Sequence, residues 1–444
     1  MKKSRILGIA VGATLAMGLS ASALATDGYQ LIGIGQYAVG MAGAVVAAPD
    51  DPLSAAMSNP AGLALLTPQA AFSAEVFNPV RKTNLGFGEI GSHTNVYGIP
   101  AIGWVAPAFA KNWVFGGGVY GTSGLGVNYL QNLSPNPHMP MGGYVQAYSS
   151  INFMQMAPSV AWKVDDHLAV GASLNIAAEQ GSFQQTLTQY VPTSFGPLPA
   201  TGGLNLSTPS WAYGVGATLG VLYKVNDMVT LGATYKSPVL FTPMTWQAGV
   251  QNQVSPATGN GVMGAPGQYS GHLNYPQQIA LGMAIRPIRQ WLISVEGQWI
   301  NWHNTMNNFN IFGPWTAYQG GVPVGGLSHI ALPMHWSNQW VANFGTQYDV
   351  NNWLQVRAGY TWGSNPISNN TIASNLIFPA IVQNAITFGA TQKLGMGWKL
   401  TEAYMHEFSN TNTGPAGSSP FGGPMPASAT MYENSYGLQV GYDF

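Results

Sequence analysis

The strict alternation between residues 211 and 223 constrains the fold more than any other feature of the chain. Its odd positions read Trp, Tyr, Val, Ala, Leu, Val, Tyr, whereas most even positions hold Ala, Gly or Thr. A period of two residues predicts a β-strand with one apolar face. About twelve steps of ~3.3 Å, tilted by about 45°, span about 28 Å, close to the ~25 Å apolar band and aromatic girdles of a membrane β-barrel. Soluble sandwich strands rarely carry aromatics at both ends of one face, so the pattern favours a barrel.

Short polar clusters followed by a bulky residue and an alternating strand recur along the chain. The bulky residues stand at positions 113, 167, 228, 291, 353 and 398. Each interval fits two strands and a longer distal loop, so six tight turns separate seven hairpins, or 14 strands. Short turns on one side and long loops on the other are typical of outer-membrane barrels. Propeller blades repeat at a similar spacing, but the aromatic-capped strand faces decide against them.

Composition agrees with a membrane barrel. Only 7% of the residues are charged, against roughly 25% in soluble proteins, and no run after residue 25 approaches the ~18 apolar residues of a membrane helix. A closed barrel crosses a bilayer because its strands satisfy one another's backbone hydrogen bonds. Cysteine is absent, which excludes thiol catalysis and cysteine metal sites.

Both ends of the chain carry processing or assembly signals. Lys2, Lys3 and Arg5 precede an apolar run, and residues 23–25 read Ala-Leu-Ala, as in a secretory signal peptide. We predict a signal peptide at residues 1–25. Its removal leaves 14 − 3 = 11 basic against 15 acidic residues, so charge gives no reason to expect nucleic acid as a partner. The last strand alternates and ends with Tyr442 and Phe444, which resembles the signal read by the outer-membrane barrel assembly machinery.

The mature chain divides into two predicted parts. Residues 26–69 are small and apolar, without barrel character, and their low charge argues against a solvated tail. We expect them to form an N-terminal plug, or hatch, in the lumen, because a lumen of fourteen strands is wide. Residues 70–444 form the predicted transmembrane barrel.

The long segments opposite the tight turns are rich in Gly, Pro, Asn and Ser, and we expect them to be extracellular loops. They lie near residues 129–149, 189–210, 249–269, 311–334, 365–384 and 409–431. Residues 311–315 and 330–334 are unusually apolar. Such patches mark binding surfaces, or they pack on each other over the barrel mouth.

The chain resembles the FadL/TodX-type outer-membrane transport proteins. The resemblance covers essentially the whole mature chain and includes residues 28–31, Asp50-Asp51, the Asn59-Pro60-Ala61 motif and the strands up to Phe444. It implies a monomeric 14-stranded barrel closed by a hatch, which passively takes up long-chain fatty acids or, in one branch, aromatic hydrocarbons. It also implies capture by outer loops, an inner site near the mature N-terminus, and exit sideways at a kink in the third strand.

The third predicted strand, residues 113–129, is rich in glycine. Glycine lacks a Cβ and so permits bulges and bends that interrupt a sheet. The candidate kink residues are Gly116, Gly117, Gly118, Gly121, Gly124 and Gly126. These glycines alternatively face a tightly packed plug.

Strand parity places Lys236 and Arg357 in the lumen, together with Glu75, Glu179 and Glu296. A buried carboxylate ligand needs a cation or several donors, so Lys236 and Arg357 are candidate ligand-binding residues. Alternatively, they pair with the inward glutamates and hold the plug. The resemblance favours fatty acids, while the scarcity of luminal cations keeps neutral hydrocarbons as the alternative.

The sequence gives little support for other classes. Asp166-His167 lies in a tight turn with no serine tied to it, and the nearest histidine pair, His329 and His335, borders one loop. We therefore predict no enzyme, no metal and no cofactor. A general porin is a weaker alternative because porin lumens are lined by charges. The expected partners are a hydrophobic ligand and outer-membrane lipids. Release into the membrane or the periplasm remains open.

Overall fold

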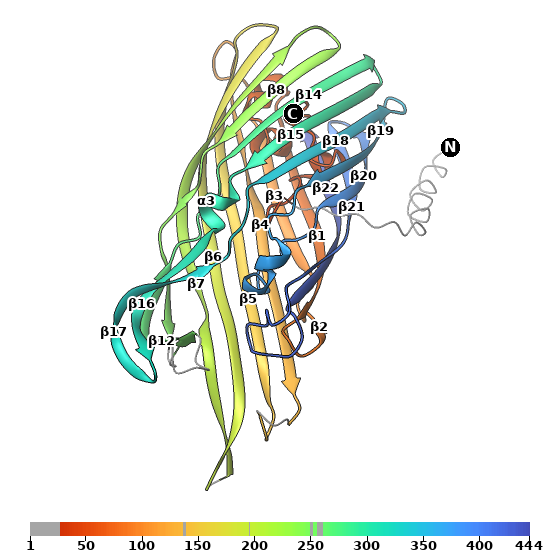
Figure 1. Ribbon diagram of the computed structural model, residues 1–444. Coiled ribbons are helices and arrows are strands. Elements are labelled where there is room, and N and C mark those ends of the chain that lie inside the picture. Colours follow the sequence, from red (N-terminus) through yellow and green to blue (C-terminus); the bar gives the residue numbers. More distant parts are fainter. Residues whose placement is uncertain (1–26, 136–138, 195, 249–251, 255–260) are drawn as a thin grey trace.

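A computed structural model describes residues 27–444 except 136–138, 195, 249–251 and 255–260. The predicted signal peptide lies outside the described residues. Within them, fourteen antiparallel strands close into a barrel (Figure 1). They are β1 (Gln69–Asn84), β3 (Tyr97–Val105), β4 (Trp113–Leu133), β5 (Gly143–Lys163), β6 (Leu168–Thr193), β7 (Gly196–Lys224), β8 (Val229–Lys236), β14 (Gln278–Ile288), β15 (Trp291–Ile300), β18 (Gln339–Asp349), β19 (Leu354–Gly363), β20 (Asn384–Gly395), β21 (Trp398–Thr413) and β22 (Ser428–Asp443). The predicted all-β, 14-stranded barrel is confirmed.

The first and last strands close the ring. β1 pairs with β22 from Gln69–Asp443 to Asn84–Ser428, and its other edge pairs with β3. The backbone N–H of Phe444 donates to the carbonyl of Pro68, and the Phe444 ring packs on Tyr442. The two residues of the predicted assembly signal therefore lie at the seam where the barrel closes, and Phe444 is exposed.

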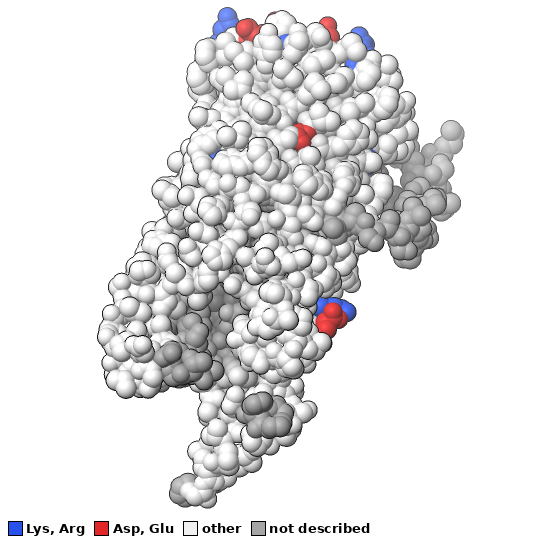
Figure 2. All heavy atoms as spheres, viewed as in Figure 1, with Lys and Arg blue, Asp and Glu red and all other residues white. Residues whose placement is uncertain are grey.

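The two faces of the barrel wall differ as the alternation predicts. In β7 the outward residues Trp211, Tyr213, Leu219 and Tyr223 are exposed, while the alternate residues are mostly buried. Charged residues on the visible surface gather mainly at one end, and the side of the barrel carries few (Figure 2). A largely apolar belt with few charges suits contact with lipid.

No helix among the described residues is long and apolar enough to cross a membrane.

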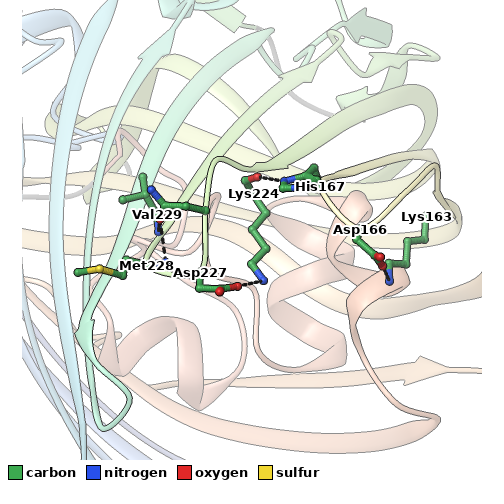
Figure 3. Close-up of polar contacts among 8 residues, drawn as sticks. Lys163, Asp166, His167, Lys224, Asp227, Met228 and Val229 are labelled. Atoms are coloured by element: carbon green, nitrogen blue, oxygen red, sulfur yellow. Dashed lines mark hydrogen bonds and ion pairs between the residues drawn. The ribbon is translucent and has the colours of Figure 1, made fainter.

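Side chains of Asp and Asn shape the tight turns. In the β5–β6 turn, Asp165 Oδ1 accepts hydrogen bonds from the backbone N–H groups of His167 and Leu168. Asn226 makes the same two contacts in the β7–β8 turn, and Asn351 repeats them before β19. Exposed ion pairs flank two turns, Lys163–Asp166 and Lys224–Asp227, each at 2.7 Å (Figure 3). The short polar clusters are thus turns, as predicted.

Two segments that we expected to be loops are mostly strand. β4 and β5 pair as far as Leu133 and Gly143, and β6 and β7 pair as far as Thr193 and Gly196. These hairpins extend well past the other strands (Figure 1). Their Gly, Thr and Asn content predicted loops. However, these residues form backbone hydrogen bonds to the neighbouring strand, so the hairpins stay regular beyond the apolar belt.

The remaining elements lie mainly on the side of the long hairpins. A second sheet combines β10 (Met244–Ala248), β11 (Asn252–Val254), β12 (Gly261–Gly264), β13 (Gly267–Gly271), β16 (Asn308–Gln319) and β17 (Val322–Pro333), while β2 (Glu89–Gly91) and β9 (Leu240–Phe241) extend β1 and β7. The short helices are α1 (Gln36–Gly40), α2 (Pro52–Met57), η2 (Pro60–Leu65), α3 (Trp302–Met306) and η3 (Asn369–Ser374). Ile311, Trp315 and Ile330 are buried, so these apolar residues of the predicted loops pack within the outer structure.

Candidate functional site inside the barrel

The N-terminal segment, residues 27–68, is almost entirely buried and contacts inward-facing groups around the barrel. The Gln36 amide reaches Ser73 and Glu75 in β1, and its backbone N–H donates to Gln439 in β22 at 2.8 Å. Opposite these strands, Glu296 in β15 accepts from the backbone N–H groups of Val45 and Val46. Inward polar residues of distant strands thus hold one short segment.

The Asn59-Pro60-Ala61 motif docks on two strands. Asn59 Nδ2 donates to the carbonyls of Val46 and Val221, at 2.8 and 3.0 Å, while its Oδ1 accepts from the Ala61 N–H. Gly171 in β6 and Gly220 in β7 lie directly beneath the motif, and a Cβ on either glycine would overlap its atoms. The motif therefore joins the segment to the wall, and its wider role stays a prediction.

Arg357 is engaged on every nitrogen. Nε donates to Gln347 at 2.8 Å, Nη1 to Thr391 at 2.7 Å and Nη2 to Gln355 at 3.1 Å. Its guanidinium also lies 4.7 Å from the centroid of the Tyr37 ring in α1, a cation–π contact. These contacts favour the structural alternative that the sequence left open, in which Arg357 holds the N-terminal segment.

Lys236 lies in a small polar cavity between two carboxyl groups. The cavity measures about 20 Å³ and is lined by Lys236, Asp27, Glu296, Gln30 and Gln278, among others. That volume suits about one water molecule, so the cavity is not a ligand pocket. Burial raises the pKa of Asp27 to about 7, although the charge of Lys236 opposes the shift.

An aromatic cluster lies next to this cavity. The Tyr29 ring stacks on Phe153 with centroids 5.4 Å apart and planes at 9°, and its centroid is 4.4 Å from that of Trp302. The ring centroids of Trp336 and Tyr275 each lie 5.9 Å from that of Tyr29. Glu179 is the direct cross-strand neighbour of Phe153 and is fully buried. We call these six residues the aromatic site.

The β3–β4 ladder is incomplete. β4 pairs with β3 only between Gly116 and Tyr120, although the strand continues to Leu133, and a bulge follows at Gly121–Ser123. Gly117 has φ +148°, which favours glycine. Beyond the ladder, the backbone of Gly126 accepts hydrogen bonds from the Arg81 guanidinium and the Tyr97 hydroxyl. The glycines of the predicted kink thus lie along the seam between β3 and β4, which side chains bridge, and the kink itself stays a prediction.

The N-terminal segment also touches this seam. Leu31 N–H donates to the Thr122 carbonyl at 3.2 Å, and Gln30 forms an isolated bridge with Ser123. Residues 122–123 are the bulged part of β4, so the segment pairs with the wall just beyond the end of the ladder between β3 and β4.

An open groove of about 870 Å³ lies among the outer hairpins and loops. It is lined by Leu187 and Leu204 of the β6–β7 hairpin and by residues of three further segments, which are the end of β17, the region from η3 to β20 and the β21–β22 connection. Apolar residues from those segments include Leu332, Pro333, Met334, Ile377, Phe378 and Phe421. Its volume suits a drug-sized apolar molecule.

The sequence anticipated only part of this arrangement. Strand parity placed Lys236, Arg357 and Glu179 inside correctly. It missed the aromatic site because Tyr275, Trp302 and Trp336 come from the connections around β14, β15 and β18. The alternation of strand residues does not extend into these connections, so it could not predict which way the three side chains point. The one available signal was the density of Trp and Tyr close to strand ends.

No enzymatic site emerges from the described residues. His167 Nδ1 lies 2.7 Å from the Lys224 carbonyl and simply joins two neighbouring turns (Figure 3). Within the ranges that the structure describes, no group of three His, Asp or Glu side chains is placed to hold a metal ion. His329 stacks on Phe312, and His335 contacts Asn307.

Comparisons with known proteins identify the family. Residues 13–444 match the family model described as outer membrane protein transport protein (OMPP1/FadL/TodX). No curated protein matches. A FadL homologue from Pseudomonas aeruginosa superposes with a TM-score of 0.71 at 17% identity, covering 94% of this chain and 100% of its own. The P. putida toluene transporter TodX gives 0.67 at 18%, covering 93% and 99%. The Ralstonia pickettii toluene transporter TbuX gives 0.64 at 17%, with the same coverage.

Proposed function

The chain belongs to the outer membrane protein transport protein family (OMPP1/FadL/TodX), and from this premise we propose that it admits neutral aromatic hydrocarbons. It resides in the bacterial outer membrane and transports hydrophobic compounds, as its family does. The proposal concerns the choice of substrate, the route and the role of the N-terminal segment.

The excess of acidic over basic residues in the interior is the main argument for a neutral substrate. Seven carboxyl residues of the described chain are buried: Asp27, Asp51, Glu75, Glu179, Glu296, Glu407 and Glu433. Among the described residues, the buried cations are Arg81 and Arg357, and Lys236 is half-buried. A ligand carboxylate in such a lumen would find few cations to pair with, and an unpaired buried charge is costly. A neutral ring avoids this cost and finds partners in the aromatic site.

The proposed route has three stations. The outer groove collects an apolar molecule, the aromatic site binds it near the mature N-terminus, and the seam between β3 and β4 releases it into the membrane. The N-terminal segment serves as the hatch that separates these stations from the periplasm. TodX and TbuX are toluene transporters, which fits an aromatic ligand for this chain.

Long-chain fatty acids are the second candidate because of Lys236. No carboxylate of the described residues lies within ion-pairing distance of its ammonium group, since the four ion pairs involve other lysines. In that case a ligand carboxylate would form an ion pair with the Lys236 ammonium group. The neighbouring Asp27 and Glu296 weigh against this arrangement.

Side-by-side uptake tests the choice of substrate. Labelled toluene and labelled oleate are offered to a Gram-negative strain that lacks its own transporter of this kind and expresses the chain. We expect uptake of toluene well above the vector control and little uptake of oleate. Selective oleate uptake would favour the second candidate. Passage of small sugars without either compound would point to a general porin.

A reversible cross-link tests lateral exit. The chain has no cysteine, and Ile99 in β3 lies 3.4 Å from the position of a Cβ added to Gly121 in β4. We expect the Ile99→Cys, Gly121→Cys pair to block uptake when oxidised and to restore it when reduced. Each single variant is the matched control. Unchanged uptake after complete oxidation would exclude the seam as the exit.

A further inference from the structure

The chain places a phenol of its own in the aromatic site. Tyr29 sits at a tight turn, where Gln30 N–H donates to the Asp27 carbonyl and Gly28 has φ +72°. The turn presses Gly28 against Trp302 and directs the Tyr29 ring between Phe153 and the two tryptophans. The turn thus presents one hydroxylated ring, which is 4% exposed.

Polar atoms in this site lack partners within the described residues. Tyr29 Oη is buried without a hydrogen bond, and so are both carboxyl oxygens of Glu179. The direct cross-strand neighbours of Glu179, Phe153 on β5 and Ala212 on β7, bring no polar side chain. Buried polar groups are normally hydrogen-bonded, so these orphaned oxygens indicate a polar group that the chain does not itself supply.

Glu179 and Tyr29 also interact electrostatically. Burial raises the pKa of Tyr29 well above its usual value, and the charges of Tyr275 and Glu179 add to that effect. The phenol hydroxyl and the carboxyl group therefore share one apolar environment, although no hydrogen bond joins them.

We propose that the aromatic site selects monocyclic aromatics that carry a hydroxyl group, with Glu179 as the hydrogen-bonding partner and Tyr29 as the ring that the ligand replaces. This rests on the proposed function and narrows its substrate class from aromatic compounds to phenols. A phenol matches both features of the site, because its ring stacks on the aromatic side chains and its hydroxyl group donates a hydrogen bond to an unpaired carboxyl oxygen of Glu179. Toluene satisfies only the first. An aromatic ammonium ion would also suit a carboxylate among aromatic rings, but the occupant that the chain itself provides is a neutral phenol.

Binding to the purified full-length mature protein in detergent tests the proposal. Equilibrium dialysis compares radiolabelled para-cresol and toluene, which differ only in the hydroxyl group. We expect para-cresol to bind about tenfold more tightly, because a hydrogen bond to a buried carboxyl oxygen that otherwise lacks a partner contributes at about that level. Glu179→Leu should abolish the preference and leave toluene binding within about twofold.

Matched variants separate this role from a structural one. Glu402→Gln removes a carboxyl group from the outer face of β21, where Tyr436 contacts it, and should leave the preference unchanged. Glu179→Gln retains an acceptor and should keep part of it. Tyr29→Ala removes the internal competitor and should tighten para-cresol binding, whereas Tyr29→Phe keeps the ring in place and should not. Heat-modifiable migration in gels establishes that each barrel is folded.

The outcomes are distinct. Toluene binding without a preference for para-cresol, or a preference that survives Glu179→Leu, overturns the proposal and leaves the proposed function standing. Preference for an aromatic ammonium ion such as benzylammonium overturns it in favour of a cation site. Absence of binding for both para-cresol and toluene overturns the proposed function together with this inference.

Discussion

Two layers of the barrel interior differ in how their central polar side chains are hydrogen-bonded. In the layer that holds the N-terminal segment, which we call the docking layer, Asn59, Arg357 and Glu296 each make two or more hydrogen bonds. In the aromatic site, Glu179 and the Tyr29 hydroxyl make none within the described chain. Satisfied polar groups fix a segment in place, whereas unsatisfied ones among aromatic rings await a ligand. Under the proposed function, this difference distinguishes the polar residues that hold the segment from those that contact the ligand.

Removing the docked segment should have the largest effect. Without residues 27–66, the fourteen strands keep their ladders, so we expect assembly to continue while the lumen opens to ions. Planar bilayer recordings should show a conductance at least an order of magnitude above that of the full chain, since barrels of this size enclose a wide lumen. Unchanged conductance would mean that the segment does not close the channel.

Blocking one docking point should have a smaller effect. Gly220→Val places a side chain where Asn59 and Pro60 lie, and overpacking of this kind costs about 1–3 kcal/mol. We expect intermittent conductance and reduced resistance of the segment to protease. Gly297→Val in β15 is the matched control, because an added Cβ there meets nothing within 4 Å. Equal behaviour of the two variants would contradict the docking interpretation.

Removing the charge at Arg357 tests the docking layer from the wall. Arg357→Met leaves Gln347, Thr391 and Gln355 without their donor and removes the contact with Tyr37. Unpartnered buried acceptors cost about 1–3 kcal/mol, so the urea midpoint for release of the segment should fall. Toluene and oleate binding should change together. Selective loss of oleate would instead assign Arg357 to ligand binding.

The barrel and the docking layer differ in how far the sequence predicts them. The Trp211–Tyr223 alternation and the Asp and Asn turns fix strand position and direction locally, so the fourteen strands follow from short-range patterns. Asn59-Pro60-Ala61 was recognisable as a motif, but its seat on Gly171 and Gly220 was not, because each strand glycine has several competing explanations. The inward orientation of Arg357 was predictable, while its partners required the register of β18, β19 and β20.

The aromatic site was the least predictable part for a physical reason. Tyr29 comes from a turn near the predicted mature N-terminus, and Trp302 and Trp336 come from the ends of long connections. No periodic pattern relates these segments, so their meeting depends on the closed barrel. Glu179 could be placed in the lumen by parity, but its lack of partners appears only once Phe153 and Ala212 are known as its neighbours.

Asp27 lies between the two layers, and its protonation should strengthen docking of the N-terminal segment. Its pKa in the folded chain is about 7, above the usual 3.8, so the docked state binds the proton more tightly than the released state. Docking should therefore be strongest below about pH 4 and weaken as the pH rises to about 7. A nitroxide label at Leu31→Cys should gain mobility over this range. Asp27→Asn should reduce the pH dependence, and the part that remains should come from other buried carboxyl groups that contact the segment, such as Glu296.

Lys236 should matter least if the substrate is neutral. Lys236 lines a small cavity together with Asp27 and Glu296, so Lys236→Met removes a charge from the docking layer and leaves all six residues of the aromatic site in place. Toluene uptake should then stay within about twofold of the parent, because one half-buried charge contributes little to a neutral ligand. Lys393→Met, at an exposed turn, controls for the loss of positive charge. A selective loss of oleate uptake would transfer Lys236 to the ligand-binding layer, and the contrast between satisfied and unsatisfied polar groups would then no longer separate structure from function in this lumen.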